Sequence, residues 1–366
     1  MTIVFFARYF YPHIGGVEKH VAEIGERLAE KGHMVIVISE NTQIPHSNIK
    51  QSKTTSATPS GKAKIIESYN IEAGNEGFLK KFRVWKQLWS YRKLIKEADI
   101  VHCHDVFFWY LPFRFLYPSK KVYTTFHGYE GNTIPGKRAK AMHKLSEKLS
   151  KGNICIGKFL EKWYGTKATY VSYGATEILK DKTGDLNKKW NKNAISNEIV
   201  FLGRLEEETG IMKYLKAFKI ITEKYPKLKL IVLGNGALRG KAEEFTKENG
   251  LNVEFKGFIT NTDDFLLRTN FVFTSRYLGI LEALAGKNYV LSTYNSLIMK
   301  DYLTETPFKD FISISQNEDG IARDFITHFE DPILTEAIVK NGFEWIKEQT
   351  WDKMTKTYLS LWSKPV

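Results

Sequence analysis

The chain of 366 residues is poor in cysteine, with only Cys103 and Cys155. Two cysteines cannot build a disulfide framework, and they fit a reducing compartment. No apolar run is long enough to span a bilayer. The apolar residues 1–6 have no basic segment before them and run directly into Arg8, so we interpret them as a first strand rather than a signal peptide. These absences predict a cytoplasmic globular protein.

Acidic residues are also in short supply, with 41 Asp and Glu against 54 Lys and Arg and a net charge of +13. This excess favours an anionic partner, such as a phosphorylated ligand, an acidic membrane surface or nucleic acid. The sequence has no recognised nucleic-acid motif, and basic charge alone is weak evidence for such binding. We therefore expect no nucleic-acid partner.

The length predicts two domains, because one ordinary core does not grow to 366 residues. The first domain, expected over 1–175, opens with apolar segments at 2–6 and 33–39 around a helical repeat at 17–31. This is a βαβ unit of a parallel sheet. Further strands are predicted at 65–69, 99–104, 121–126, 152–156 and 168–172. A polar stretch without period, 43–64, is predicted to be a mobile surface loop.

A polar, lysine-rich segment at 176–197 is predicted to link the domains, and the second domain is expected over 198–340. Its strands are predicted at 198–202, 229–233, 253–255, 271–274 and 289–292. Helical patterns separate most of them, so the fold class is α/β with two doubly wound domains. The remaining residues, 341–366, are predicted to be helical.

The strands of the second domain end in turns that contain glycine. These turns are Phe201-Leu-Gly-Arg-Leu205, Leu233-Gly-Asn-Gly236, Phe255-Lys-Gly-Phe258 and the segment from Ser275 to Ala283. The carboxyl ends of parallel strands converge on one crevice. An arginine for a diphosphate, glycines for close backbone approach and Glu282 for a ribose diol would together hold a sugar nucleotide.

The order and spacing of these turns, together with Gly15-Gly16-Val17-Glu18 and Thr125-Phe126-His127-Gly128, resemble retaining glycosyltransferases with the GT-B fold, family 4. The resemblance covers nearly the whole chain. It implies two Rossmann-like domains facing a central cleft, with the acceptor on the first domain and a nucleotide-sugar on the second. It also implies that 341–366 crosses back to the first domain, and that the chemistry needs no metal or cofactor besides the donor.

The resemblance gives roles to individual residues. His127 would lie beside the transferred sugar, and Arg204 would hold the diphosphate and stabilise its charge as it leaves. The donor-binding residues that it implies are Gly15, Gly16, Gly203, Arg204, Thr209, Lys213, Gly234, Phe258, Ile259, Arg276, Tyr277, Leu278, Gly279, Ile280, Leu281 and Glu282.

Two positions depart from the family pattern. Thr209 stands where the family has a lysine, and Lys213 is the expected substitute one helical turn later. Thr274 stands where the family has the first of two glutamates, of which only Glu282 is present. Arg276 or Tyr277 would then fill the space beside the donor sugar.

Three further polar residues flank His127. His102 and His104 end a predicted strand, and we expect them either to be structural or to line the acceptor side together with Glu130. No carboxylate cluster accompanies the histidines, so no metal site is expected there.

The segment 80–96 holds seven Lys and Arg and no acidic residue. Two interpretations stay open: a core-packed helix with a solvated basic face, and a helix that lies on an anionic membrane. The membrane-docking candidates are Lys80, Lys81, Arg83, Trp85, Lys86 and Trp89. A second aromatic cluster at 107–113 favours a lipid-linked acceptor.

The resulting hypothesis is a retaining hexosyltransferase that moves a sugar from a UDP- or GDP-linked donor to a glycan or lipid-linked acceptor, in the assembly of surface polysaccharide or glycolipid. It would be cytoplasmic, with attachment at the inner face of the plasma membrane as an open option. The alternatives are a GT-B sugar-nucleotide epimerase and a catalytically degenerate scaffold or binding protein.

Overall fold

The structure is a computed structural model that describes residues 1–11, 13, 15–40, 54–55, 66–72, 80–128, 134–179, 189–190 and 195–363. It divides into two compact units. Unit 1 comprises Met1–Tyr129, Pro135–Ser172 and Trp351–Val366, and unit 2 comprises Glu130–Ile134 and Tyr173–Thr350. Among the described helices, none combines the length and the apolar character needed to cross a membrane.

Unit 1 is built on an eight-stranded sheet in the order β3-β4-β2-β1-β5-β6-β7-β8. The strands are β1 (Thr2–Ala7), β2 (Met34–Glu40), β3 (Thr54–Thr55), β4 (Ile66–Ile71), β5 (Ile100–His104), β6 (Lys121–Phe126), β7 (Asn153–Ile156) and β8 (Tyr170–Ser172). All neighbouring pairs are parallel except β3 with β4. Every residue of β5 and β7 is buried, as expected for parallel strands covered on both faces.

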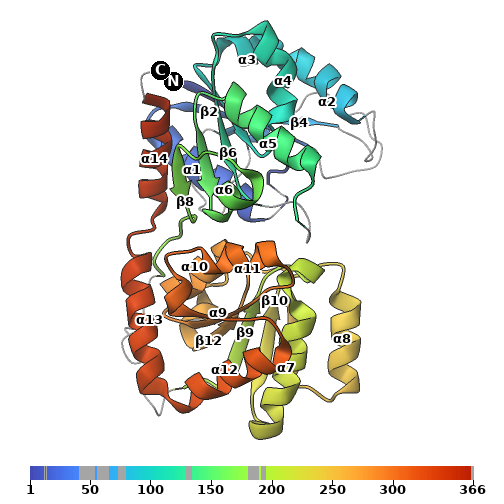
Figure 1. Cartoon of the computed structure of the whole chain (residues 1–366), viewed down its shortest axis with the longest axis vertical. Helices are drawn as coiled ribbons and strands as arrows, with labels where there is room; N and C mark the ends of the chain where they lie inside the picture. The colour runs from blue at the N-terminus through green and yellow to red at the C-terminus, as the bar shows by residue number, and fades with distance from the viewer. Residues whose placement is uncertain are drawn as a thin grey trace. The chain divides into compact units, whose positions relative to one another are not determined.

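The helices of unit 1 include one from the far end of the chain. They are α1 (Gly16–Glu30), α2 (Lys80–Leu88), the 3₁₀ turn η1 (Trp89–Tyr91), α3 (Arg92–Glu97), α4 (Phe107–Leu116), α5 (Lys137–Leu149), α6 (Phe159–Tyr164) and α14 (Trp351–Ser363). Figure 1 shows α14 in red, and it packs against α1 and β8. The last described helix thus completes the unit that the first strand begins.

Unit 2 carries a fully parallel six-stranded sheet in the order β11-β10-β9-β12-β13-β14. The strands are β9 (Glu198–Leu202), β10 (Lys229–Leu233), β11 (Val253–Gly257), β12 (Phe271–Phe273), β13 (Tyr289–Thr293) and β14 (Ile312–Ser315). The helices are η3 (Glu207–Thr209), α7 (Ile211–Lys224), α8 (Arg239–Glu248), α9 (Asp263–Arg268), α10 (Tyr277–Ala285), α11 (Leu297–Thr304), η4 (Lys309–Phe311), α12 (Glu318–Glu330) and α13 (Pro332–Ile346).

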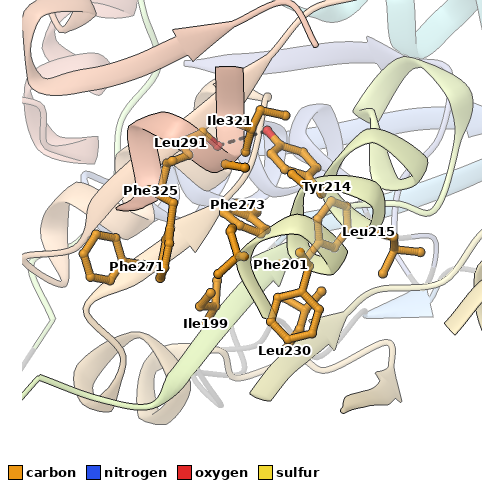
Figure 2. Packing of buried hydrophobic residues seen from close by; sticks show 14 of the residues in the cluster. Ile199, Phe201, Tyr214, Leu215, Leu230, Phe271, Phe273, Leu291, Ile321 and Phe325 are labelled. Atoms are coloured by element: carbon orange, nitrogen blue, oxygen red, sulfur yellow. Dashed lines mark hydrogen bonds between the residues drawn. The ribbon is translucent and has the colours of Figure 1, made fainter. Parts of the chain in front are cut away.

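The core of unit 2 lies between the sheet and α7 and α12 (Figure 2). Phe273 of β12 stacks on Tyr214 of α7, with ring centroids 4.9 Å apart. The buried Tyr214 hydroxyl donates to the Leu291 carbonyl oxygen at 3.0 Å, the dashed line in Figure 2. This bond satisfies a polar group that would otherwise be costly inside an apolar core.

The predicted strands of both sheets are present, and the differences lie elsewhere. The basic segment 80–96 is not one helix, because η1 interrupts it between α2 and α3. β14 was not predicted, since its sequence Ile-Ser-Ile-Ser is only half apolar. Of the stretch expected to be a mobile loop, 43–64, only Thr54–Thr55 lies within the described residues, as a two-residue strand.

Two boundaries also differ from the expected domain ranges. Trp190, within the predicted linker, is buried, and its indole N–H donates to the Lys287 carbonyl oxygen of unit 2 at 2.9 Å. In the C-terminal segment, α13 packs on α10 in unit 2, and only α14 belongs to unit 1. Within unit 2, Gly342 permits a close approach of α13 to Leu284 of α10.

Phe271 tests the aromatic core of unit 2. It is buried among Trp190, Tyr289 and Phe325, with centroid distances of 4.8 to 6.1 Å. Phe271→Ala is expected to lower the free energy of unfolding by about 3–5 kcal/mol, because it leaves a cavity. Ile333→Ala, at a position that is 79% exposed, is the control and should change it by less than about 0.5 kcal/mol. Urea unfolding of both variants makes the comparison, and equal stabilities would contradict this packing.

Candidate functional site

Each sheet has a point where the direction of strand addition reverses. In unit 1 it lies between β1 and β5, and in unit 2 between β9 and β12. Loops that leave neighbouring strands at such a point diverge to opposite sides of the sheet and open a crevice at the carboxyl ends. Most of the predicted site residues follow these strands or their neighbours, so each unit carries one candidate crevice.

In unit 2, glycines bring the ends of β9 and β10 together. Gly203 and Gly234 have φ of 157° and 148°, in the region that side chains rarely adopt. The Gly203 amide donates to the Leu233 carbonyl oxygen at 3.1 Å, and the Gly234 amide donates to that of Gly257 at 2.8 Å. A Cβ on Gly234 would lie 1.8 Å from the Gly203 carbonyl oxygen. Only glycine fits this contact.

The loop after β9 presents Arg204 to solvent. The Arg204 side chain is 64% exposed and pairs with Glu208 at 2.8 Å. Thr209 is buried beneath it, and its hydroxyl lies 2.6 Å from the Arg204 carbonyl oxygen. The Thr209 hydroxyl also accepts from the Glu206 amide as part of a capping box. Thr209 therefore shapes the backbone that carries the arginine, a role that a lysine there could not fill.

The first turn of α10 lies against the ends of β9 and β12. A Cβ on Gly279 would meet the Thr274 hydroxyl oxygen at 2.5 Å and a Leu202 methyl at 3.6 Å, so glycine permits this approach. The Ile280 amide donates to the Arg276 carbonyl oxygen, and the Tyr277 amide donates to the Tyr302 hydroxyl. The helix itself leaves the amides of Leu278 and Gly279 without intrahelical partners, and they carry its partial positive charge.

Thr274, where the family has its first glutamate, and the two expected substitutes Arg276 and Tyr277 have different surroundings. The Thr274 hydroxyl is buried and has no hydrogen-bond partner among the described residues. The Tyr277 ring stacks on Tyr302 at 3.8 Å, and its hydroxyl donates to the Tyr302 carbonyl oxygen at 2.5 Å. Arg276 and Glu282 are half-buried, at the start and in the middle of the same helical segment. Of the two expected substitutes, Arg276 is therefore the more accessible.

The other predicted donor residues of unit 2 divide between the crevice and the core. Phe258 follows β11 and is 50% exposed, and Ile259 beside it is half-buried. Leu281 is fully buried. The Lys213 ammonium donates to the carbonyl oxygens of Tyr294 and Gln316, at 2.7 and 2.6 Å. Burial lowers the pKa of this ammonium, which is used to join neighbouring loops.

In unit 1, Gly15 and Gly16 begin α1 at the carboxyl end of β1. Gly15 is the N-cap, and Gly16 is exposed. The Glu18 carboxylate folds back to within 2.4 Å of where a Gly15 Cβ would be, and it pairs with His13 at 2.8 Å. A carboxylate at this helix N-terminus is favoured by the helix dipole. Glu130, expected on the acceptor side, lies outside the described residues.

The carboxyl ends of β5 and β6 bring two predicted histidines into contact. His104 Nδ1 and His127 Nε2 are 2.9 Å apart and share one hydrogen bond. The His127 amide donates to Asp105 at 2.9 Å, and Asp105 adopts a left-handed φ of 61°. Burial, with smaller contributions from neighbouring histidines, lowers the pKa of both imidazoles well below the usual range. The pair is neutral at pH 7.

His102 lies deeper and belongs to a buried chain of hydrogen bonds. Trp362 of α14 donates to His102 Nδ1 at 3.1 Å. Indole has no acceptor, so the His102 proton is on Nε2, which donates to the Thr125 hydroxyl at 2.7 Å. Thr125 is bonded to Tyr358 at 2.8 Å, and Tyr358 to His20 Nε2 at 2.8 Å. α14 thus fixes the tautomer of His102.

Sequence reasoning missed four of these residues: His20, Asp105, Tyr358 and Trp362. A signal for the last two was present, because Tyr358 and Trp362 are spaced by four and face one side of a helix. Nothing in the sequence pairs them with histidines more than 200 residues away.

The membrane-docking candidates face different directions. Phe82 and Trp89 are 55% and 51% exposed on α2 and η1. Trp85 is half-buried and donates its indole N–H to the Phe108 carbonyl oxygen at 2.9 Å. Lys80 pairs with Glu40 at 2.8 Å. Lys81, Arg83 and Lys86 remain on the surface of α2, where they flank the exposed rings.

Comparison with known proteins supports the resemblance to glycosyltransferases along most of the chain. Residues 182–345 match the family model of glycosyl transferases group 1, and residues 14–166 match that of glycosyltransferase family 4. The uncharacterized glycosyltransferase MJ1069 of Methanocaldococcus jannaschii is 23% identical over 405 residues, which span 100% of this chain and 99% of the relative. The uncharacterized glycosyltransferase MJ1059 of the same organism is 38% identical over 115 residues, only 29% of this chain and 28% of that protein.

Several solved structures align along nearly the full length of the chain. HepE of Anabaena, crystallised with UDP and glucose, superposes with a TM-score of 0.72. The alignment has 14% sequence identity and covers 99% of each chain. At this identity the likeness concerns the fold alone, which is the GT-B fold with its two α/β units.

The contact between the ends of β9 and β10 can be tested with two glycines. Gly234→Ala is expected to lower the free energy of unfolding by at least about 2 kcal/mol, because it combines an unfavourable φ with a backbone clash. Gly240→Ala is the matched control, because a Cβ there meets nothing within 4 Å and alanine favours a helix interior by about 0.5–1 kcal/mol. Denaturant unfolding should show a lower free energy of unfolding than the parent chain for Gly234→Ala, and a higher one for Gly240→Ala.

Proposed function

Because the chain belongs to the GT-B glycosyltransferases of group 1 and family 4, we propose that it transfers a hexose from a nucleotide-diphosphate sugar to a glycan or lipid-linked acceptor. The observation that carries this proposal is the set of groups at the carboxyl ends of the strands in unit 2. Around the reversal between β9 and β12, it comprises an exposed arginine, two amides at the start of α10 and a glutamate on the same helix.

Arg204 and the start of α10 would bind the leaving diphosphate. Arg204 would exchange its surface pair with Glu208 for a forked contact to phosphate oxygens, at little cost because exposed ion pairs contribute little. The amides of Leu278 and Gly279 would add donors and the helix dipole. These groups stabilise charge that grows as the sugar–phosphate bond breaks, which is where an enzyme gains most.

Glu282 is assigned to the ribose. A carboxylate can accept from both hydroxyls of a ribose diol. Phe258, half exposed at the end of β11, provides an apolar surface for the base, with backbone groups of Ile259 beside it. A UDP-linked donor is favoured over GDP by the UDP in HepE; the choice of base is decided by titration.

The chemistry proposed is transfer with retention. The bond between C1 and the diphosphate oxygen breaks, and a bond between C1 and the acceptor oxygen forms on the same face. The acceptor proton passes to the leaving phosphate oxygen, so no protein base is needed. His127, neutral and held by His104, would contact the transferred sugar. We propose that this step uses no metal or cofactor besides the donor.

Thr274 limits which donor fits. Its short hydroxyl replaces a carboxylate that would reach the sugar hydroxyls, and Arg276 is the accessible group nearby. This exchange favours a donor hexose that carries a negative or strongly accepting group. A scaffold without turnover is the alternative that the same replacement supports, and an epimerase would turn over donor without acceptor.

Glu282 is the residue whose loss tests the donor site. Glu282→Ala should weaken nucleoside diphosphate binding about 10–100-fold, the equivalent of losing charged hydrogen bonds. Titration calorimetry with UDP, GDP and ADP measures it. Glu330→Ala, at a surface ion pair with Lys224, is the control and should bind as the parent does. Folded parent chain that binds none of the three nucleotides would refute the transferase function.

A peripheral membrane site is the second part of the proposal, supported by the exposed rings of Phe82 and Trp89 among basic side chains. The two buried, unpaired cysteines support a cytoplasmic location, and attachment would then be at the inner face of the plasma membrane. An anionic surface attracts such a segment by about 1 kcal/mol per basic residue near it.

The membrane part is tested by vesicle sedimentation. The double variant Phe82→Ser, Trp89→Ser should lose most of its binding to vesicles with anionic lipid, because it removes the exposed apolar surface. Ile333→Ser, at a position on α13 that is more exposed than either ring, should sediment as the parent chain does. Binding that is unchanged in the double variant, or absent in the parent, would rule this surface out.

A further inference from the structure

Three histidines from separate elements of unit 1 converge at its crevice. His20 lies on α1, His104 ends β5, and His127 follows β6. One nitrogen of each ring lies within 4.8 Å of the others, and among the described residues these three are the group that could hold a metal ion. His20 and His104 are buried, and His127 is half-buried.

The spacing of the rings matches coordination to one ion. The ring centroids of His127 lie 4.7 Å from His20 and 5.2 Å from His104, and those of His20 and His104 are 6.0 Å apart. Three imidazoles on a tetrahedral ion, with metal–nitrogen bonds of about 2.0–2.1 Å, place their centroids about 5.2 Å apart. The observed centroid distances bracket this value. The nitrogen atoms, now within 4.8 Å of one another, would have to approach to about 3.3 Å around such an ion.

The protonation of the cluster also suits a metal. Burial lowers the pKa of His20 to about 3 and holds those of His104 and His127 well below the usual range. Each neutral ring keeps one lone pair, the form that coordinates a cation.

A second observation points to an absent partner. His104 Nε2 is buried and makes no hydrogen bond within the described part of the chain. A buried polar atom without a partner is uncommon, and coordination is one way to satisfy it. His20 in turn is held by the Tyr358 hydroxyl, the kind of outer contact that orients metal-bound histidines when the ion takes the other ring nitrogen.

We propose that His20, His104 and His127 form a binding site for a borderline divalent transition-metal ion, with Zn²⁺ as the preferred occupant. Three neutral imidazoles with a position open to water suit Zn²⁺, Co²⁺, Ni²⁺ and Cu²⁺, and they disfavour Mg²⁺ and Ca²⁺, which take oxygen ligands. The ion is no cofactor of the transfer, and the site stands independently of the proposed function.

Occupancy has a consequence for the crevice. An ion that binds His127 through Nε2 would displace the hydrogen bond that this nitrogen now makes with His104 Nδ1. His127 could then no longer contact a sugar as proposed above. The site would thus act as an inhibitory one, in which metal and substrate compete for the same histidine.

The test is a Co²⁺ titration of the full chain, prepared without a polyhistidine tag and stripped with a chelator. We expect one equivalent of Co²⁺ to give the visible absorption of a tetrahedral or five-coordinate site, and Zn²⁺ to displace it. His127→Gln, at the half-buried position, and His20→Gln should each weaken binding about tenfold or more. His33→Gln, a histidine outside the cluster, should bind as the parent does.

Absence of a saturable cobalt spectrum in the folded parent chain would overturn the site. So would a spectrum that persists unchanged in both His127→Gln and His20→Gln, with thermal unfolding used to confirm that the variants are folded. Donor turnover with and without Zn²⁺ is measured separately, with chelator added back. A chain that binds cobalt but has no transferase activity would refute the proposed function and leave the metal site intact.

Discussion

A parallel sheet covered on both faces restricts where polar chemistry can be placed. In β1, five consecutive residues from Ile3 to Ala7 are buried, and β13 is buried throughout. A strand in such a sheet has no solvent-exposed face on which polar side chains could lie. Polar side chains therefore concentrate where the strands end, and the reversals of strand order at β1/β5 and β9/β12 decide which ends leave room for a ligand.

Close backbone approach is what converts those strand ends into a site. Gly203, Gly234 and Gly279 let three chain segments come within contact distance, and a Cβ at Gly234 or Gly279 would collide. The same loops are then held by side chains without a direct role, such as Thr209 beneath Arg204. The arginine and the amides at the start of α10 thus rest on a supported framework rather than on independent loops.

Unit 1 departs from this division, because its core contains histidines. His102 and His104 are buried on β5 and are kept neutral by burial. Neutral imidazoles inside a protein need partners. For His102 and His20, α14 supplies them through Trp362 and Tyr358, which take part in a chain of hydrogen bonds from His102 to His20. The C-terminal helix is therefore needed by the crevice as well as by the packing of the unit.

Much of the fold could be predicted, because long apolar runs and glycine turns carry strong local signals. The strands 2–6, 99–104 and 229–233 were predicted at or within a residue of β1, β5 and β10. β14 was missed because its polar alternation gives no such run, and the single helix expected over 80–96 was wrong because tertiary packing inserts η1. For the candidate site, the sequence could indicate residue types, whereas it could not indicate the hydrogen-bond partners of each side chain. Lys213 and Tyr277 suit phosphate and sugar by type, yet both are committed to bonds with neighbouring loops.

The sequence by itself determined the α/β class, the strand-end glycines, the arginine and the glutamate, since each depends on local pattern and spacing. It also determined the membership in a glycosyltransferase family, which rests on the order of those motifs. Only the tertiary structure decided that α13 and α14 belong to different units, that Trp362 donates a hydrogen bond to His102 Nδ1, and that His20 meets His104 and His127. His20 is 84 positions from His104 and 338 positions from Tyr358. No local sequence pattern can encode such contacts, because only the completed fold brings these residues together.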